Sequence, residues 1–319
     1  MSNLNHSEST TIPLGSNGLQ ISPMGVGAWA WGSSFFWGYG RTHDETDVRA
    51  AFRTSLEAGI NYFDTAETYG NGRSELLLGQ MTRDVESPII VSTKFFPFPW
   101  RLRERSLRRA LKASLIRLGM STIDLYLIHW PFPPVSIETW MAGLADAVES
   151  GMARSVGVSN YNIEQLGRAR AALAERGVPL ACNQVNFSLL QPKEERESLL
   201  EACRELDVTL VAYSPLAQGL LTGKYAPSHP PPWPRRWWID HGLLARLEDL
   251  IGLMTEIGQG HDGKLPAQVA LNWVICKGTV PIPGAKNARQ ALENAGAMGW
   301  QLTDDEITAL EESSERVLV

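Results

Sequence analysis

Short apolar runs alternate along the chain with longer segments in which apolar and charged residues mix. Six runs of four to six residues are each followed directly by a polar or aromatic residue, and their ends are about thirty positions apart: 60–63, 89–93, 123–128, 155–158, 180–183 and 208–212. Nearly continuous, β-branched apolar runs are typical of parallel strands that are covered on both faces. The pattern therefore predicts a repeated parallel strand.

The segments between the runs repeat apolar residues at i, i+3 and i+4, which indicates helices with one face against a sheet. We expect helices at 44–58, 101–118, 137–150, 162–176 and 194–206. A glycine follows four of these segments, at positions 59, 119, 151 and 177, as often happens just beyond a helix C-terminus. The order is therefore strand then helix, repeated.

Two further strands complete the repeat. Residues 24–27 supply a first strand, and residues 279–282 supply a last one, followed by a helix at 288–298. Eight strands predict an α/β fold of the closed (β/α)8 TIM-barrel type. The alternative is an open doubly wound sheet, but Gly25, Gly27 and Gly32 lack the spacing of a dinucleotide-binding glycine motif.

Several segments lie outside the repeat. Residues 12–22 predict a β-hairpin that turns at 15–18, and helices are expected at 243–257, 266–276 and 303–315. The last helix begins with Thr303 and has Glu306 three positions later, which is a capping box. Residues 219–240, rich in Trp and Pro at 230–238, form a long loop after strand seven, either a lid over the site or an ordinary insertion.

Composition narrows the class of protein. The 319 residues fit one barrel domain at 11–319 behind a flexible tail at 1–10. The net charge of −6 argues against nucleic acid as the main partner, and no apolar run is long enough for a membrane helix. The three cysteines are scattered, so we expect no disulfide framework and no metal site. We expect a cytoplasmic protein that is a monomer or a weak oligomer.

Polar residues at the strand ends form the candidate active site. The carboxyl ends of the strands in a closed parallel barrel meet at one mouth, which gathers Asp64, Lys94 and His129, and Tyr69 follows closely enough to reach them. The ammonium group would lower the pKa of the phenol, the carboxylate would offset the ammonium charge, and the imidazole would orient a carbonyl oxygen. The group suits protonation of an oxygen during carbonyl reduction. A Schiff base on Lys94 is the chemical alternative.

Carbonyl reduction needs a hydride, and no side chain supplies one, so a nicotinamide cofactor is implied. Polar side chains at 159, 160 and 184 offer hydrogen bonds to a carboxamide, and Tyr213 offers a flat ring. After the eighth strand, Lys286 and Arg289 lie where barrels often bind phosphate. Two cations favour a ribose 2′-phosphate, which predicts NADPH/NADP+ as the cofactor.

Three segments in the right order resemble the signatures of the aldo-keto reductase family: 61–70, 157–160 and 281–287. The third is followed by Gln290, Glu293 and Asn294, as in that family. The segment at 214–225 resembles the corresponding segment in one branch of that family, which contains bacterial reductases, plant plastid members and potassium-channel β subunits. The resemblance covers nearly the whole chain and implies a barrel that binds NADP(H) without a Rossmann domain.

The resemblance also implies residue roles. Asp64, Tyr69, Lys94 and His129 match the catalytic tetrad, with Tyr69 as the general acid. The retained His129 indicates carbonyl reduction rather than double-bond reduction. The implied cofactor contacts are Ser159, Asn160, Gln184, Tyr213, Ser214, Leu216, Gln218, Gly219, Gly284, Lys286, Arg289, Gln290 and Asn294.

Aromatic residues crowd the segments that follow the strands. Eleven Trp is a high count, and we expect four of them, Trp29, Trp31, Trp100 and Trp130, to line the substrate pocket. An apolar, stacking pocket favours aromatic or hydrophobic aldehydes and ketones as small-molecule substrates. The alternative is a regulatory subunit that binds NADP(H) and senses redox state, with only incidental turnover.

Overall fold

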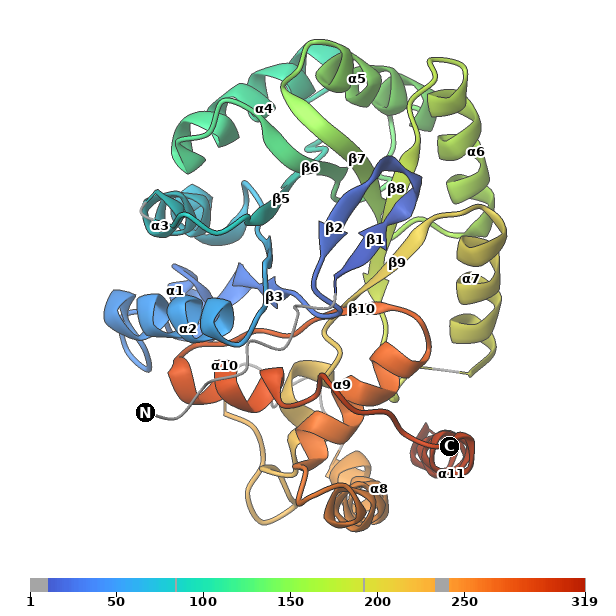
Figure 1. Cartoon of the computed structure of the whole chain (residues 1–319). Helices are drawn as coiled ribbons and strands as arrows, with labels where there is room; N and C mark the ends of the chain where they lie inside the picture. Colours follow the sequence, from blue (N-terminus) through green and yellow to red (C-terminus); the bar gives the residue numbers. More distant parts are fainter. Residues whose placement is uncertain (1–10, 84, 192, 233–240, 319) are drawn as a thin grey trace.

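The computed structural model describes residues 11–83, 85–191, 193–232 and 241–318 (Figure 1). The expected flexible tail at 1–10 and most of the Trp-Pro segment, residues 233–240, lie outside the described residues. No helix within the described ranges is both long enough and apolar enough to cross a membrane.

Eight parallel strands follow one another around a barrel in chain order, as predicted (Figure 1). Each begins and ends within a few residues of its predicted run: β3 Val26–Gly27, β4 Tyr62–Asp64, β5 Ile90–Phe95, β6 Ile123–Ile128, β7 Ala153–Ser159, β8 Leu180–Asn186, β9 Thr209–Tyr213 and β10 Val280–Ile282. The last strand meets the first through backbone bonds from Gly25 to Pro281 (2.9 Å) and from Gly27 to Pro283 (3.0 Å). A Cβ atom on Gly27 would lie 2.8 Å from the Ile282 carbonyl oxygen, so a glycine permits this closure.

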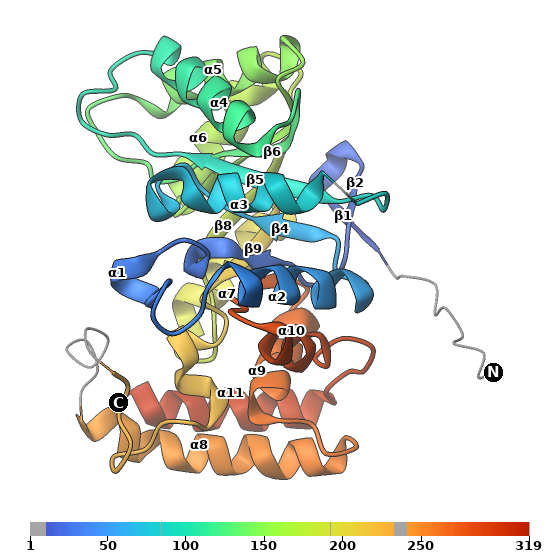
Figure 2. The same cartoon turned by 90° about the vertical axis from the view of Figure 1, so that its left-hand side faces the viewer.

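Helices surround the barrel (Figure 2). Their bounds are α1 Ser34–Trp37, α2 Glu45–Glu57, α3 Arg73–Thr82, α4 Glu104–Leu118, α5 Ile137–Glu149, α6 Ile163–Ala174, α7 Lys193–Glu205, α8 His241–Gly260, α9 Pro266–Cys276, α10 Ala288–Ala295 and α11 Asp304–Leu318. The sequence analysis missed the single-turn α1 and also α3, which follows Gly72 and has no side-chain cap to mark its start. The capping box at Thr303 and Glu306 is present, with bonds of 2.8 and 3.3 Å.

The predicted hairpin closes one end of the barrel. Strands β1 Ile12–Leu14 and β2 Leu19–Ile21 pair antiparallel, and Figure 2 places them on the opposite side of the molecule from α1. Leu14, Leu19 and Ile21 pack in one cluster with side chains from the strand interiors. A second, larger cluster lies between the strands and the outer helices. The hairpin seals one end of the barrel, so the site is built at the other.

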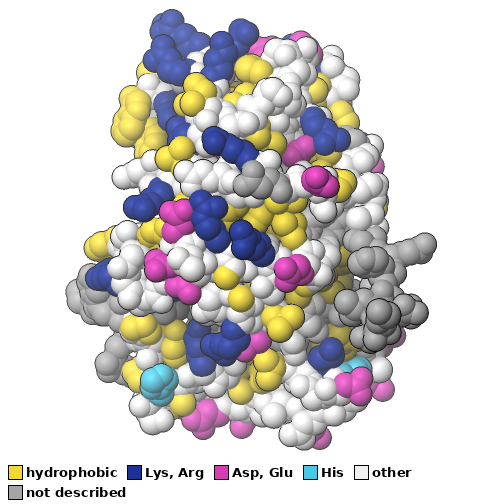
Figure 3. Space-filling view, turned by 60° about the vertical axis from the view of Figure 1, so that its left-hand side comes forward, with side chains coloured by type: hydrophobic (Ala, Val, Ile, Leu, Met, Phe, Trp, Pro, Cys, Tyr) yellow, Lys and Arg dark blue, Asp and Glu magenta, His cyan; other side chains and the backbone are white. Residues whose placement is uncertain are grey.

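The positive charges of this acidic chain are unevenly distributed. Figure 3 shows Lys and Arg side chains gathered at the upper end of the molecule, the end where Figure 1 places α4 and α5. Four exposed cations lie on α4: Arg105, Arg108, Arg109 and Lys112. This basic end lies outside the strand-end site.

Candidate active site

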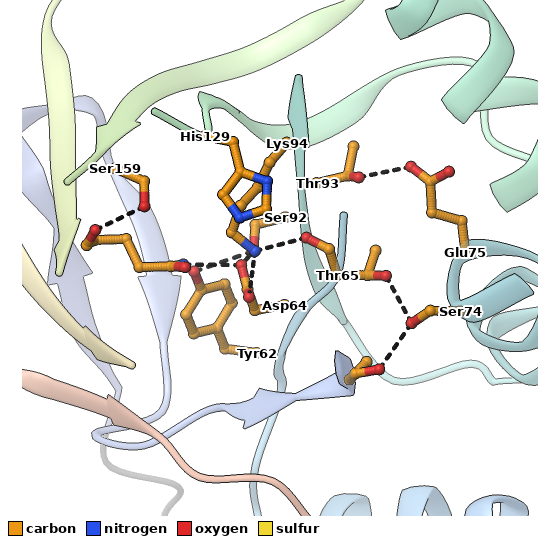
Figure 4. Close-up of polar contacts among 12 residues, drawn as sticks. Tyr62, Asp64, Thr65, Ser74, Glu75, Ser92, Thr93, Lys94, His129 and Ser159 are labelled. Carbon is orange, nitrogen blue, oxygen red and sulfur yellow. Dashed lines mark hydrogen bonds and ion pairs between the residues drawn. The ribbon is translucent and has the colours of Figure 1, made fainter. Parts of the chain in front are cut away.

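The strand ends bring together the residues predicted for the tetrad. Asp64 ends β4 and Lys94 lies near the end of β5, while His129 directly follows β6. Tyr69 begins the 3-10 segment η3 Tyr69–Gly72 in the loop after β4. Figure 4 shows Lys94 directed at Asp64, with His129 beside them. Their convergence follows from the parallel register of neighbouring strands.

Lys94 and Asp64 form a buried ion pair in which the ammonium group and both carboxylate oxygens have hydrogen-bond partners. The Lys94 Nζ donates to Asp64 Oδ2 at 2.5 Å and to the Thr65 carbonyl oxygen at 2.7 Å. The other oxygen, Asp64 Oδ1, accepts from the Ser92 hydroxyl at 2.6 Å and from Gln184 Nε2 at 2.9 Å. Burial lowers the pKa of Lys94, and the Asp64 carboxylate opposes that change. Such saturation is what a buried pair needs to offset its desolvation.

Two supporting residues were missed in the sequence analysis. Ser92 bonds with Asp64, and its hydroxyl also lies 3.1 Å from the Tyr62 hydroxyl. Ser92 stands two positions before Lys94, and Tyr62 stands two before Asp64. Residues at i and i+2 share one face of a strand. The period of two was therefore the signal that could have identified them.

The phenol of Tyr69 lies against this pair, with the Lys94 Nζ 5.0 Å from the ring centroid. The expectation that the ammonium would lower the phenol's pKa is wrong for this structure. Desolvation raises the pKa of Tyr69 well above its ordinary value, and the negative charge of Asp64 adds to the increase. The loss of water around the buried phenol therefore outweighs the effect that was expected of the ammonium. The phenol therefore stays protonated at neutral pH, as a proton donor must.

His129 stands edge-on to Tyr69, with the ring centroids 5.9 Å apart. Desolvation lowers the pKa of His129 to about 3, and the positive charge of Lys94 acts in the same direction. The imidazole is therefore neutral at physiological pH, with one N–H donor and one acceptor nitrogen. Its buried Nδ1 has no hydrogen-bond partner within the described part of the chain.

The residues assigned to the carboxamide lie at neighbouring strand ends. Asn160 adopts a left-handed backbone (φ 63°) directly after β7, and its Nδ2 donates to the His129 carbonyl oxygen at 3.1 Å. Its Oδ1 accepts from the Tyr213 hydroxyl at 2.9 Å, which fixes the orientation of that ring at the end of β9. Ser159 donates to the backbone of Gln184 at 2.8 Å. These three strand ends form one hydrogen-bonded group.

The loop after β9 has an unusual backbone. Positive φ angles occur at Ser214 (51°), Ala217 (46°), Gln218 (56°) and Gly219 (95°). Leu216 is the residue before the 3-10 segment η4 Ala217–Thr222. Left-handed turns of this kind can direct backbone N–H groups toward an anion. The loop therefore suits a pyrophosphate.

The segment after β10 carries the two expected cations. Lys286 Nζ donates to the Trp37 carbonyl oxygen at 2.8 Å, and Arg289 pairs with Glu293 at 2.8 Å. The Gln290 side chain accepts from the Lys286 backbone N–H at 2.9 Å, and Asn294 donates to the Gly284 carbonyl oxygen at 3.3 Å. Lys286, Arg289 and Gln290 thus lie at the start of α10, and Asn294, near its end, reaches back to the residues before it.

Taken together, these groups have the chemistry that a nicotinamide dinucleotide phosphate needs. Amide and hydroxyl groups lie beside the tetrad, an oriented aromatic ring ends β9, and a left-handed loop follows it. Two cations stand at the N-terminus of α10, where the helix dipole also favours negative charge. The donor set fits NADP(H) in kind and in order along the barrel mouth.

Aromatic rings surround Tyr69 and His129. Trp29 stacks on Phe36 at 5.0 Å and lies 6.1 Å from Tyr69, centroid to centroid. Trp100 stacks on Phe98 at 4.7 Å, and Trp130 stacks on Phe132 at 5.3 Å. These stacks place three of the four expected tryptophans in the aromatic groups around the mouth.

Trp31 does not fit the pocket-lining role that was expected of it. Its side chain is fully buried, and the indole N–H donates to the Ala285 carbonyl oxygen at 2.8 Å. Its ring belongs to the larger core cluster, with its centroid 6.4 Å from that of Phe63 on β4. This tryptophan therefore supports the barrel wall.

A (β/α)8 barrel whose mouth carries this donor set is typical of an oxidoreductase that binds NADP(H). Residues 23–315 match the Aldo/keto reductase family, and the chain belongs to that family. The expected family, fold and oxidoreductase class are thereby confirmed.

Relatives agree with this assignment. The chain is 43% identical to pyridoxal reductase, chloroplastic, from Arabidopsis thaliana, over 92% of this chain and 83% of the relative. A glycerol dehydrogenase from Gluconobacter oxydans has a similar structure (TM-score 0.83, 26% identity, 98% of this chain and 97% of the other). An aldo-keto reductase from Klebsiella pneumoniae in complex with NADPH is also similar (TM-score 0.73, 25% identity, 94% and 93%).

These relatives bear on the cofactor and on the compartment. Aldo-keto reductase structures from Klebsiella pneumoniae contain NADPH in one case and NADP in another, which confirms the expected cofactor at the level of the family. The Arabidopsis thaliana relative is named as chloroplastic, so a cytoplasmic location for this chain stays a prediction. The expected monomer or weak oligomer also stays a prediction.

Proposed function

We propose that the chain is an NADPH-dependent reductase that converts aldehydes and ketones to alcohols, with a preference for aromatic or hydrophobic substrates. The observation that carries the proposal is the saturated Lys94–Asp64 pair beneath the protonated phenol of Tyr69. A buried, compensated ammonium beside a phenol suits the stabilisation of negative charge as it develops on an oxygen.

In this proposal the tetrad handles one proton at the substrate oxygen. Tyr69 donates its phenolic proton to the carbonyl oxygen, and Lys94 stabilises the phenolate that forms. Asp64 holds Lys94 in place, while neutral His129 donates one N–H to the same oxygen and orients it. NADPH, when bound, supplies the hydride.

The cofactor would be held along the mouth from β7 to α10. Ser159, Asn160 and Gln184 would hold the carboxamide, and Tyr213 would stack on the nicotinamide ring. The loop after β9, with Ser214, Leu216, Gln218 and Gly219, would bind the pyrophosphate. Gly284, Lys286, Arg289, Gln290 and Asn294 would hold the adenosine 2′-phosphate end. Gln184 donates to Asp64 in the structure, which would link the carboxamide side to the tetrad.

A Schiff-base reaction on Lys94 has less support. The Lys94 side chain is fully buried, and its amine donates to both Asp64 and the Thr65 carbonyl oxygen. A nucleophilic amine must be unprotonated and able to reach the substrate carbon. The ion pair favours the protonated form, so it supports a role in electrostatic stabilisation rather than in covalent catalysis.

Pyridoxal and simple aryl aldehydes are the first substrates to test. The Arabidopsis thaliana relative is named a pyridoxal reductase, and this chain has aromatic rings around the tetrad. Offset stacking of a flat substrate ring on such a wall is favourable.

The test is the Tyr69→Phe variant in an NADPH-oxidation assay with pyridoxal and benzaldehyde. Loss of the general acid should lower kcat by about 10² to 10⁴ while leaving the Kd for NADPH unchanged. Tyr126→Phe is the matched control, because the Tyr126 hydroxyl is buried with no partner within the described ranges. Unchanged turnover in Tyr69→Phe would remove the phenol from the mechanism. A wild type that binds NADPH but reduces no carbonyl would favour the regulatory alternative.

A further inference from the structure

The loop that carries the catalytic tyrosine is tied to the loop that carries part of the aromatic wall. Glu67 lies two residues before Tyr69, and Arg101 lies between β5 and α4. Arg101 Nη2 donates to Glu67 Oε2 at 3.1 Å, and Arg101 Nη1 donates to Glu67 Oε1. The two bonds make a bidentate pair, which fixes orientation as well as distance.

Both partners also hold the backbone of the second loop. Glu67 Oε1 accepts from the Phe96 N–H at 2.8 Å, and Arg101 Nη1 donates to the Phe96 carbonyl oxygen at 2.9 Å. Phe96 is therefore held on both its amide and its carbonyl group. The Glu67 side chain is only 9% exposed and that of Arg101 only 21%, so solvent screens this pair less than a surface pair.

The same guanidinium packs on two aromatic rings, that of Phe95 at the end of β5 and that of Phe98 in the loop that follows. Its carbon lies 4.8 Å from the Phe95 ring centroid and 5.2 Å from that of Phe98. Phe98 stacks on Trp100, and Phe96 stands edge-on to His129 with centroids 5.6 Å apart. One arginine thus positions the rings that run from the tetrad to the exposed Trp100.

We propose that Glu67 and Arg101 are positioning residues that set the specificity of the site for ring-bearing carbonyl compounds. They fix the wall formed by Phe96, Phe98 and Trp100 at a set distance from Tyr69. A wall fixed before binding costs less conformational entropy when a flat substrate stacks on it. A small aliphatic aldehyde gains little from the wall and should not depend on the pair. The inference rests on the proposed carbonyl reduction.

The main test is Arg101→Met, which keeps an apolar side chain of similar length and removes the guanidinium group that bonds to Glu67. We expect the KM for benzaldehyde to rise about tenfold, the loss of one good ring contact, while kcat and the KM for propanal stay within about twofold. Arg101→Lys keeps the charge without the bidentate geometry and should fall between wild type and Arg101→Met. Arg103→Met is the matched control, since Arg103 is exposed and forms no ion pair with any described residue.

Glu67→Gln and the double variant test whether the two residues act as one unit. If they do, the double variant should raise the benzaldehyde KM no more than Arg101→Met alone. Titration calorimetry with benzamide, an unreactive ring compound, measures binding to the aromatic wall without turnover. The Kd for benzamide should rise in Arg101→Met as the KM for benzaldehyde does.

Two results would overturn the inference: equal KM changes for benzaldehyde and propanal, or unchanged benzamide binding in Arg101→Met. The benzamide titration still decides the point if the wild type reduces no carbonyl compound. In that case the proposed function fails, and the role of the pair is judged separately.

Discussion

The tetrad residues could be identified from the sequence because each stands at or just after the end of an apolar run. Partners on the same strand, such as Ser92, could have been found from the period of two, but partners from other loops could not, since their side-chain direction depends on the folded structure. The Glu67–Arg101 pair joins loops after different strands, and its members are 34 positions apart. The pKa of the Tyr69 phenol shows the same limit, because burial of the ring, which the sequence does not reveal, is the larger cause of its rise and the Asp64 charge the smaller.

His129 should make the stability of the protein sensitive to acid. Its pKa is about 3 in the folded chain and about 6.5 when unfolded, so the unfolded chain takes up the proton first. The free energy of unfolding should therefore fall as the pH drops below about 6.5, with a loss of about 2 kcal/mol at about pH 4.5. Urea unfolding of wild type and His129→Gln at about pH 6.5 and about pH 4.5 measures this loss of stability. An equal loss in the two proteins would contradict the assignment to His129.

At the scale of elements, all eight barrel strands were predicted, whereas two helices, α1 and α3, were not. Runs such as 123–128 are marked by their apolar continuity, and β6 occupies those same residues. Helix α3 was missed because it starts at a glycine with no capping side chain, whereas α6 starts at Asn162 with a full capping box. Capping alone did not decide which helices were predicted, since α4 also lacks a side-chain cap and was expected from its apolar spacing.

The turn of the amino-terminal hairpin should tolerate a side chain at one glycine and not at the other. Gly15 (φ +60°) would place a Cβ atom 2.6 Å from the Ala181 carbonyl oxygen, whereas Gly18 (φ +81°) has nothing within 4 Å. Both alanine variants meet the left-handed cost of about 1 kcal/mol, and Gly15→Ala should lose about 2 kcal/mol more through overlap with β8. Urea unfolding compares them. Equal losses would mean that the hairpin can move away from the barrel end.

At the scale of the whole molecule, the proposed cofactor site draws on β7, β8, β9 and the start of α10, which are far apart in sequence. A ligand that contacts all of them stabilises the folded barrel as a unit, because it binds only the folded form. The contacts among these residues form only when the barrel is closed. Motif spacing could therefore predict the residues of the proposed site but not their mutual contacts. It also makes thermal stability a readout of cofactor binding.

NADPH at about one hundred times its Kd should add about 2.7 kcal/mol and raise the Tm by about 5 °C. NADH at the same concentration should raise it less, since it lacks the 2′-phosphate that Lys286 and Arg289 are proposed to bind. In the Lys286→Ala/Arg289→Ala double variant the NADPH shift should fall to the NADH value, each measured against the same variant without cofactor. Lys112→Ala, an exposed cation on α4, should keep the full difference. Equal shifts for the two cofactors in wild type would show that these cations do not select the phosphate.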